Sequence, residues 1–507
     1  MSFPSRSFTK WLILLSACLT AVLIPLCFTG PAVALPAIHA ALGGGPVALN
    51  WVVNGYILTY GGAMLAVGSL ADTYGRKRVW LAGLAAFAAV TTAIPYAPNV
   101  LTLDFLRLAQ GLAGSAAFAG AMAALTQEFS GPARTRVFSL LGTTFGLGLA
   151  FGPLLAGALV QGFGWHAVFQ VPAALSVLSL LLTWMCAHET RDPGASGLDW
   201  SGALTFTGAL TLFTHALLQA PEDGWSAPNV VAELVASALM LAAFVGVERR
   251  RARPMLDLSL FADLRFVGVQ FLAASPAFAY VVLIILLPAR FIGVEGYSPL
   301  AAGRLMIALS LPLLVVPFLA ALAARWVTAG ALSGLGLLIA AAGLLWLGGS
   351  LSAGGGALVP MAAIGIGIGL PWGLMDGLAV GVAPKERAGM AAGIFNAVRV
   401  AGDGIAIAVA GALLAAFLHT GLVHAGATGD LTLAANRAVL GDLGPLAGTL
   451  PSPMGARALY DGAFARLLDV LAAIAAVTAL IVFAALGRVR AHDMATEAEL
   501  VEEAVQA

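Results

Sequence analysis

The stretch Gly68-Ser-Leu-Ala-Asp72-Thr-Tyr-Gly75-Arg76-Lys77-Arg78 lies between two long apolar runs of the chain and decides its fold. A carboxylate beside three cations at a helix junction can pair with them or sit at a helix N-terminus, and bonds of that kind can form in one conformation and break in the other. Glycines permit a tight turn or close contact between helices. A basic loop that only anchors two helices has no need of this spacing. We therefore predict a conformational gating role for Gly68, Asp72, Gly75, Arg76, Lys77 and Arg78.

The composition excludes two broad classes of protein. Of 507 residues, 60% are hydrophobic and 10% are charged, against about 25% charged in an ordinary soluble domain. A soluble globule needs more polar surface, and a disordered chain has fewer apolar residues. The 25 basic and 25 acidic residues cancel, so no nucleic-acid partner is indicated. The three cysteines lie in apolar runs and imply no disulfide framework.

Fourteen apolar runs are each long enough to cross a bilayer as a helix, which takes about 20 residues. None of these runs shows the alternation of apolar and polar residues over about ten positions that is typical of a membrane β-barrel strand. The first run is long and contains three prolines, so we interpret it as a retained helix rather than a cleaved signal peptide. The runs are 11–36, 51–71, 78–97, 101–125, 136–160, 165–187, 199–219, 229–247, 267–289, 300–322, 329–351, 356–382, 389–418 and 463–487.

These runs predict an all-α polytopic membrane protein arranged as six, two and six helices. Lys and Arg gather near alternate span ends, which places both termini in the cytoplasm. Two six-helix halves with a pair between them are typical of secondary transporters. The expected divisions are an N-terminal bundle over 11–187, an inserted helix pair with its linkers over 188–266, a C-terminal bundle over 267–487 that includes an outside loop over 419–462, and a cytoplasmic tail over 488–507.

The loop at 68–78 resembles the signature of the major facilitator superfamily between its second and third helices. Phe105-Leu-Arg107-Leu-Ala-Gln110-Gly111 is similar to the family's helix-4 motif, whose arginine is associated with proton coupling. Gly146-Leu-Gly148-Leu-Ala-Phe-Gly152-Pro153-Leu-Leu-Ala-Gly157 resembles the helix-5 motif of antiporters, in which glycines permit close helix packing. From this resemblance we assign a helix-packing role to Gly148, Gly152, Pro153 and Gly157.

Four further segments resemble the fourteen-helix drug:proton antiporter branch of that superfamily. The segments begin at Trp51, Glu248, Gly296 and Ala388. The chain also departs from the branch, because Cys27 stands where many relatives carry a helix-1 aspartate. A thiol in an apolar site is a poor proton carrier, so the usual coupling scheme is in doubt at this position.

Charges inside a bilayer are costly, so those within spans are candidates for function. Asp104 and Arg107 share a helix face and are expected to pair. Asp376 and Arg399 lie roughly 12 and 15 Å from the inner ends of their helices, and Asp403 is one turn beyond Arg399. We expect a buried charge cluster of these three residues that takes up and releases protons. The alternative is a structural ion pair that only fixes helix packing.

Other polar and aromatic side chains are expected to line the transport pathway or to pack between helices. These predicted cavity residues are Cys27, Asn54, Tyr56, Gln110 and Trp372. Three residues are weaker candidates for function, namely His215, Glu233 and Asp469. Helix packing explains His215 as well, and contact with water near a span end explains the two acids as well.

The resemblance implies a proton-coupled antiporter that exports hydrophobic or amphipathic small molecules. We expect a monomer in the cell inner membrane, with a small-molecule substrate, protons and the lipid bilayer as partners, and with no cofactor, metal or catalytic residue. The alternatives are an exporter of one endogenous metabolite, a membrane-embedded enzyme, and a sensor or scaffold that has lost proton coupling. An enzyme needs a nucleophile, a metal or paired acids in a cavity. In the sequence, only Asp376 and Asp403 come near to such a pair of acids.

Overall fold

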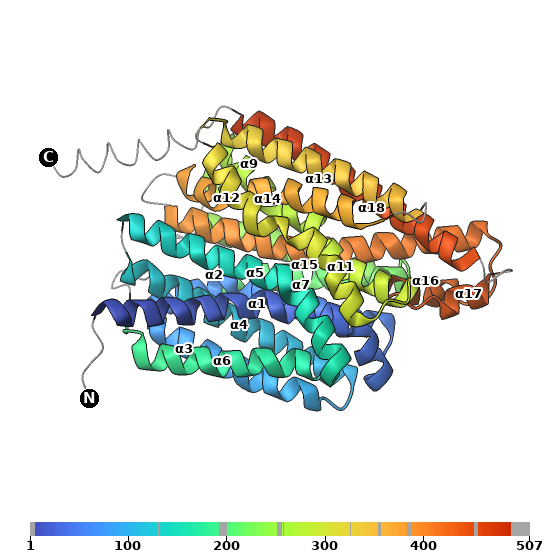
Figure 1. The fold of residues 1–507 in the computed structure, drawn as a ribbon, viewed down its shortest axis with the longest axis horizontal. Coiled ribbons are helices and arrows are strands. Elements are labelled where there is room, and N and C mark those ends of the chain that lie inside the picture. Colours follow the sequence, from blue (N-terminus) through green and yellow to red (C-terminus); the bar gives the residue numbers. More distant parts are fainter. Residues whose placement is uncertain are drawn as a thin grey trace. The chain divides into compact units, whose positions relative to one another are not determined.

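The computed structural model describes residues 6–129, 131–191, 200–250, 256, 258–324, 326–352, 356–382, 388–450 and 455–487. Across these ranges the chain forms helices joined by turns and bends, without a strand (Figure 1). Some predictions lie outside the described residues. They concern the tail over 488–507, the linker ranges 192–199 and 251–255, and the loop over 383–387.

By their contacts, the residues divide into two compact units. The first unit covers 1–255, 284–306 and 428–449, and the second covers 256–283, 307–427 and 450–507. The predicted domain boundaries describe blocks of helices along the chain, and they stay a prediction. The helices of the first unit are α1 (Arg6–Leu42), α2 (Pro46–Tyr74), α3 (Arg76–Ala93), η1 (Ile94–Tyr96), α4 (Val100–Glu128), α5 (Gly131–Phe163), α6 (Ala167–Cys186), α7 (Trp200–Asp223), α8 (Pro228–Arg250), most of α10 (Val282–Ala289), η4 (Arg290–Val294), most of α11 (Pro299–Ser310), α16 (Leu431–Val439) and α17 (Gly444–Thr449).

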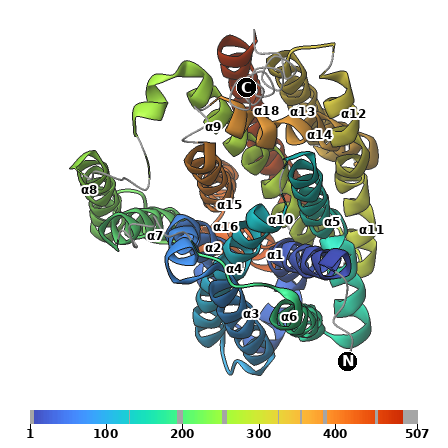
Figure 2. The same cartoon turned by 90° about the vertical axis from the view of Figure 1, so that its left-hand side faces the viewer.

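The second unit is built from the remaining helices, and α13, α14 and α18 run side by side in it (Figures 1 and 2). The π-helical turn η3 interrupts the long helix that begins at Leu264, and a second π-helical turn, η4, ends it. The helices of the second unit are η2 (Leu258–Ala262), α9 (Leu264–Pro276), η3 (Ala277–Val281), α12 (Pro312–Ala323), α13 (Ala329–Ser352), α14 (Leu358–Gly381), α15 (Ala388–His424) and α18 (Gly455–Leu486).

The helices match the predicted spans. Thirteen helices among the described residues are long and apolar enough to cross a membrane. The helix α2, which is not among the thirteen, has 29 residues and contains the predicted second span. Over its described residues, each of the fourteen predicted runs therefore coincides with one or more helices, and the all-α expectation is confirmed. Helices satisfy their backbone hydrogen bonds internally, which a chain inside hydrocarbon must do.

Small residues set the helix spacing in the first unit. A β-carbon at Gly120 of α4 would lie 2.7 Å from the backbone nitrogen of Trp80 on α3. Gly83 of α3 similarly faces the backbone of Ala117 on α4. Between membrane helices, packing of this kind replaces the hydrophobic drive that works in water, since lipid is as apolar as the side chains.

In the inserted pair, α7 lies beside α2, and α8 packs on α7 (Figure 2). Thr207 of α7 donates a hydrogen bond of 3.0 Å to the carbonyl of Gly62 on α2. Ser237 of α8 donates one of 2.7 Å to the carbonyl of Ala209 on α7. The pair is therefore attached to the first unit through α7.

Replacing Gly367 of α14 by alanine should lower the thermal unfolding midpoint of the detergent-solubilised protein. The new β-carbon would lie 2.6 Å from the carbonyl oxygen of Gly336 and 2.8 Å from the Cα of Ala340, both on α13. Overpacking of this kind typically costs about 1–3 kcal/mol. Gly349 on α13 has open space around it, so Gly349→Ala is the matched control and should not lower the midpoint. Equal midpoints for the two variants would contradict the close packing of α13 and α14.

Candidate functional site

Arg107 is the centre of a polar cluster in the first unit. Its side chain on α4 is fully buried. The Nε group donates to the carbonyl of Val52 on α2 at 2.6 Å, and Nη2 donates to the carbonyl of Cys27 on α1 at 2.7 Å. Nη1 donates to Oε1 of Gln110, one turn along α4. One guanidinium therefore links three helices.

Aromatic rings and a second amide complete this Arg107 cluster. The guanidinium carbon lies 4.5 Å from the ring centroid of Tyr56 and 5.8 Å from that of Phe169, a cation–π arrangement. Nε2 of Gln110 donates to Oγ1 of Thr91 at 2.8 Å and faces Sγ of Cys27 at 3.5 Å. The predicted residues Cys27, Tyr56 and Gln110 thus meet around Arg107.

Asp104 does not form the expected pair with Arg107. Among the ion pairs of the described residues none joins the two side chains, because the guanidinium N–H groups are engaged by carbonyls and by Gln110. Asp104 is nevertheless buried, and its Oδ1 has no hydrogen-bond partner within the described part of the chain. The Arg107 charge still acts on it electrostatically. The predicted cavity residue Asn54 is also buried, and it donates to the carbonyl of Asn50 at 3.1 Å.

The second unit brings Asp376 and Arg399 together. Nη1 of Arg399 on α15 lies 3.4 Å from Oδ1 of Asp376 on α14. Nη2 of Arg399 donates to Oδ1 of Asn396 at 2.8 Å, and the guanidinium lies 5.6 Å from the ring centroid of Phe395. Asp403 is half-buried one turn further along α15, where the Arg399 charge acts on it. The side chain of Asp376 is 59% exposed and that of Arg399 only 14%, so the pair lies at an accessible edge.

Two polar features of the second unit were not predicted from the sequence. Tyr280 is fully buried, donates to Oγ of Ser310 at 2.8 Å and makes an edge contact with the predicted cavity residue Trp372, with ring centroids 6.3 Å apart. Gln270 on α9 is buried, and neither atom of its amide has a partner among the described residues. Both residues are uncharged and lie in apolar runs, so a search for charges within spans did not find them. Gln270 could have been found from the sequence as a lone amide within a span.

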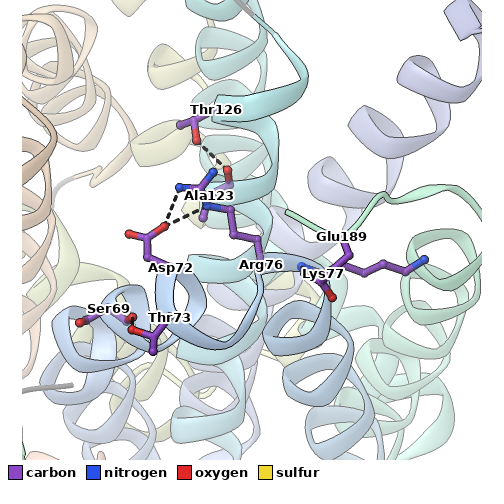
Figure 3. A network of polar contacts seen from close by, with 8 residues as sticks. All are labelled: Ser69, Asp72, Thr73, Arg76, Lys77, Ala123, Thr126 and Glu189. Atoms are coloured by element: carbon purple, nitrogen blue, oxygen red, sulfur yellow. Dashed lines mark hydrogen bonds and ion pairs between the residues drawn. The ribbon is translucent and has the colours of Figure 1, made fainter. Parts of the chain in front are cut away.

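The predicted gating loop, residues 68–78, contains a close ion pair (Figure 3). Arg76 donates to Oδ1 of Asp72 from Nε at 2.9 Å and from Nη2 at 2.7 Å. Gly75 between α2 and α3 has a φ of +115°, which residues other than glycine rarely adopt. Lys77 donates from Nζ to the carbonyl of Trp184 at 3.1 Å, and Arg78 lies 3.6 Å from Glu189. Gly68 has open space where a β-carbon would be, so close packing does not explain it.

The glycines of the helix-5 motif face two different neighbours. Gly148 and Gly152 of α5 lie against Pro25 and Thr29 of α1, where a β-carbon would overlap both. Gly157 lies against the backbone of Pro299 at the start of α11. Pro153 also belongs to this second contact, since a β-carbon at Gly303 of α11 would lie 2.7 Å from its carbonyl oxygen.

The three weaker candidates, His215, Glu233 and Asp469, differ in their surroundings. His215 of α7 and Glu233 of α8 form a contact of 2.7 Å, and the ring of Trp51 on α2 lies 5.8 Å from the imidazole. Asp469 of α18 is exposed. Within the described residues, no group of three or more His, Cys, Asp or Glu side chains is placed to hold a metal ion.

Comparison with known families decides the identity of the fold. The model of the Major Facilitator Superfamily matches residues 17–407. The chain belongs to the major facilitator superfamily. It is an integral membrane transporter of that superfamily, and the recognition from sequence is confirmed.

Known relatives span most of this transporter. It is 32% identical over 402 residues to the multidrug resistance protein Stp of Mycobacterium tuberculosis, covering 77% of this chain and 73% of that protein. It is 35% identical over 422 residues to the cephamycin export protein CmcT of Amycolatopsis lactamdurans, covering 80% and 85%. A crystal structure of a bacterial homologue of the human lysosomal transporter Spinster has a TM-score of 0.62 at 18% identity and covers 96% of this chain and 98% of that chain. That likeness supports the fold.

Arg107→Lys should destabilise the transporter. A lysine ammonium cannot reach the acceptors on α1, α2 and α4 together, and each charged hydrogen bond that is lost costs about 1.5–3 kcal/mol. Arg457→Lys is the control, because Arg457 on α18 is 59% exposed and pairs only loosely with Asp461 at 3.9 Å. Thermal unfolding in detergent measures both. If both variants unfold at the wild-type temperature, Arg107 does not hold the three helices.

Gly152→Ala should reduce the packing of α5 on α1 and slow transport. The added methyl would overlap Oγ1 of Thr29, at a cost of about 1–3 kcal/mol. Gly142 on the same helix has open space, so Gly142→Ala is the matched control. Unfolding midpoints and dye efflux from cells report the difference. A wild-type midpoint for Gly152→Ala would remove the packing role from this motif.

Proposed function

We propose that the transporter exports hydrophobic or amphipathic small molecules in exchange for protons, from the cell inner membrane with both termini in the cytoplasm. The observation that carries the coupling is the contact of 3.4 Å between Arg399 and Asp376, two charges on membrane helices of one unit. Charged residues within spans usually face a cavity or a partner and mark ion pathways. The exposed side of Asp376 is the point at which a proton or a substrate enters.

The arrangement of charges explains how one proton is handled. Arg399 has one positive charge and stands between two carboxylates on the chain, Asp376 and Asp403, so the cluster has a net charge of −1 when both are ionised. Arg399 neutralises one of them and leaves the other to bind a proton. When a conformational change separates Arg399 from Asp376, the proton affinity of that carboxylate rises, and approach of the arginine drives the proton off. Substrate and proton then compete for one site, which produces exchange.

The first unit has a different part in this scheme. Arg107 has no acid at position 27, and its N–H groups are satisfied by carbonyls and an amide. We assign it, together with the buried Asp104, an electrostatic role in coupling, and we assign Cys27, Tyr56 and Gln110 to the wall of the substrate pathway beside it. The Asp72–Arg76 pair forms in one conformation and opens in the other, which couples the loop to alternating access.

The direction and the substrate class draw on the relatives. Their names include multidrug resistance and drug efflux proteins, which favours export of varied small molecules. A second candidate is export of one endogenous natural product. It is favoured by relatives named for the export of cephamycin and of tetracenomycin C. Protection of a sensitive host against many unrelated compounds supports the first, and protection against a single compound supports the second.

Asp376→Asn and Asp403→Asn should each slow ethidium efflux driven by a pH gradient in everted vesicles. An asparagine cannot exchange a proton, and coupling between two linked sites is typically worth roughly 5- to 150-fold. Asp469→Asn is the matched control, because this carboxylate is exposed on α18 of the same unit. Ethidium binding to the purified variants shows whether the site survives. Full efflux in both cluster variants would reduce the cluster to a structural ion pair.

A further inference from the structure

The segment directly after α6 contacts helices that are far away in sequence. Its residues 188–190 lie beside the start of α3 and the end of α4. His188 contacts the carboxylate of Glu128, the last residue of α4, with Nδ1 and Oε1 3.0 Å apart. The two following residues contact the start of α3 instead. All these residues belong to the first unit.

The first turn of α3 lacks a cap of its own. The residue before the helix is Gly75, which has no side chain to accept a hydrogen bond. The first N–H groups of any helix have no partner within it and need one from elsewhere. Arg76 donates its backbone N–H to the carbonyl of Thr190 at 2.9 Å, and Lys77 donates its backbone N–H to Oε1 of Glu189 at 3.2 Å. The segment after α6 thus satisfies two of these groups.

Gly75 makes room for this contact. A β-carbon at position 75 would lie 2.8 Å from the carboxylate carbon of Glu189, closer than real contacts allow. Glu189 therefore lies directly against the turn between α2 and α3, beside Lys77 (Figure 3). Glycine at position 75 therefore permits both the contact with Glu189 and the positive φ of the turn.

The charge of Glu189 adds to the backbone bond. A carboxylate at a helix N-terminus interacts favourably with the partial positive charge there. Its ion pair with Arg78 is long, at 3.6 Å, and the arginine side chain is 78% exposed. Exposed pairs of this kind contribute little. The helix terminus, rather than Arg78, is the main partner of Glu189.

We infer that Glu189 caps α3 from the end of α6 and so positions the gating loop. The capped turn contains Arg76, whose side chain pairs with Asp72 of α2. A frayed first turn would move Arg76 away from Asp72, and the loop would lose the pair that is made and broken in the transport cycle. Glu189 is a positioning residue, since it acts through α3. The effect on transport rests on the proposed function, whereas the cap itself does not.

Two measurements test this inference on the full-length protein in detergent and in everted vesicles. In Glu189→Ala, hydrogen exchange of the first amides of α3 should become roughly 2- to 30-fold faster, the factor that corresponds to loss of a helix N-cap. The maximal rate of ethidium efflux should fall while the KM for ethidium stays unchanged. Glu189→Gln keeps an oxygen that accepts the Lys77 N–H but loses the charge, so it should lie between wild type and Glu189→Ala in both measurements.

Glu128→Gln is the matched control. It removes a carboxylate from the same segment's contacts, at His188, without touching α3, so exchange at the start of α3 should stay at the wild-type rate. Unchanged exchange in a folded Glu189→Ala protein would overturn the cap. Faster exchange with an unchanged efflux rate would overturn the positioning of the loop. If the wild-type protein itself moves no ethidium against a pH gradient, the proposed function fails, and the exchange measurement still decides the cap.

Discussion

Inside hydrocarbon no water is available to satisfy a backbone amide, and this constraint governs the whole structure. Each described span meets it with a helix, whose hydrogen bonds are internal. The helices must then attract one another without a hydrophobic drive. They do so through close backbone contact at glycines such as Gly120 and Gly152, where a β-carbon would collide with the neighbouring helix.

The same constraint decides what surrounds each buried charge. Arg107 has no acidic partner in the described cluster, and backbone carbonyls, an amide and two aromatic rings surround it instead. A guanidinium suits this role because its five donors point in fixed directions. Arg399 in the second unit is different, since it pairs with an exposed carboxylate. A charge saturated by neutral acceptors favours a fixed arrangement, and an ion pair at an accessible edge favours one that opens and closes.

The loop between α2 and α3 shows how local sequence and distant contacts combine. Gly75 ends one helix and begins the next with a backbone conformation that glycine adopts readily. Its lack of a side chain also admits Glu189, from 114 positions further along the chain. The bonds from the backbone of Arg76 and Lys77 to residues 189 and 190 therefore depend on the packing of α6 against α3.

The sequence by itself determined the class of protein, the helical spans and the loop in which Asp72 lies beside three cations, because apolar run length and neighbouring charges are local properties. It also placed Asp376 and Arg399 at matching depths, since helix rise converts residue number into distance. Only the tertiary structure decided that Arg107 bonds to carbonyls rather than to Asp104, that Gln270 is buried without a described partner, and that Glu189 caps α3. These outcomes depend on which helix faces which, and such contacts join residues that no local pattern links.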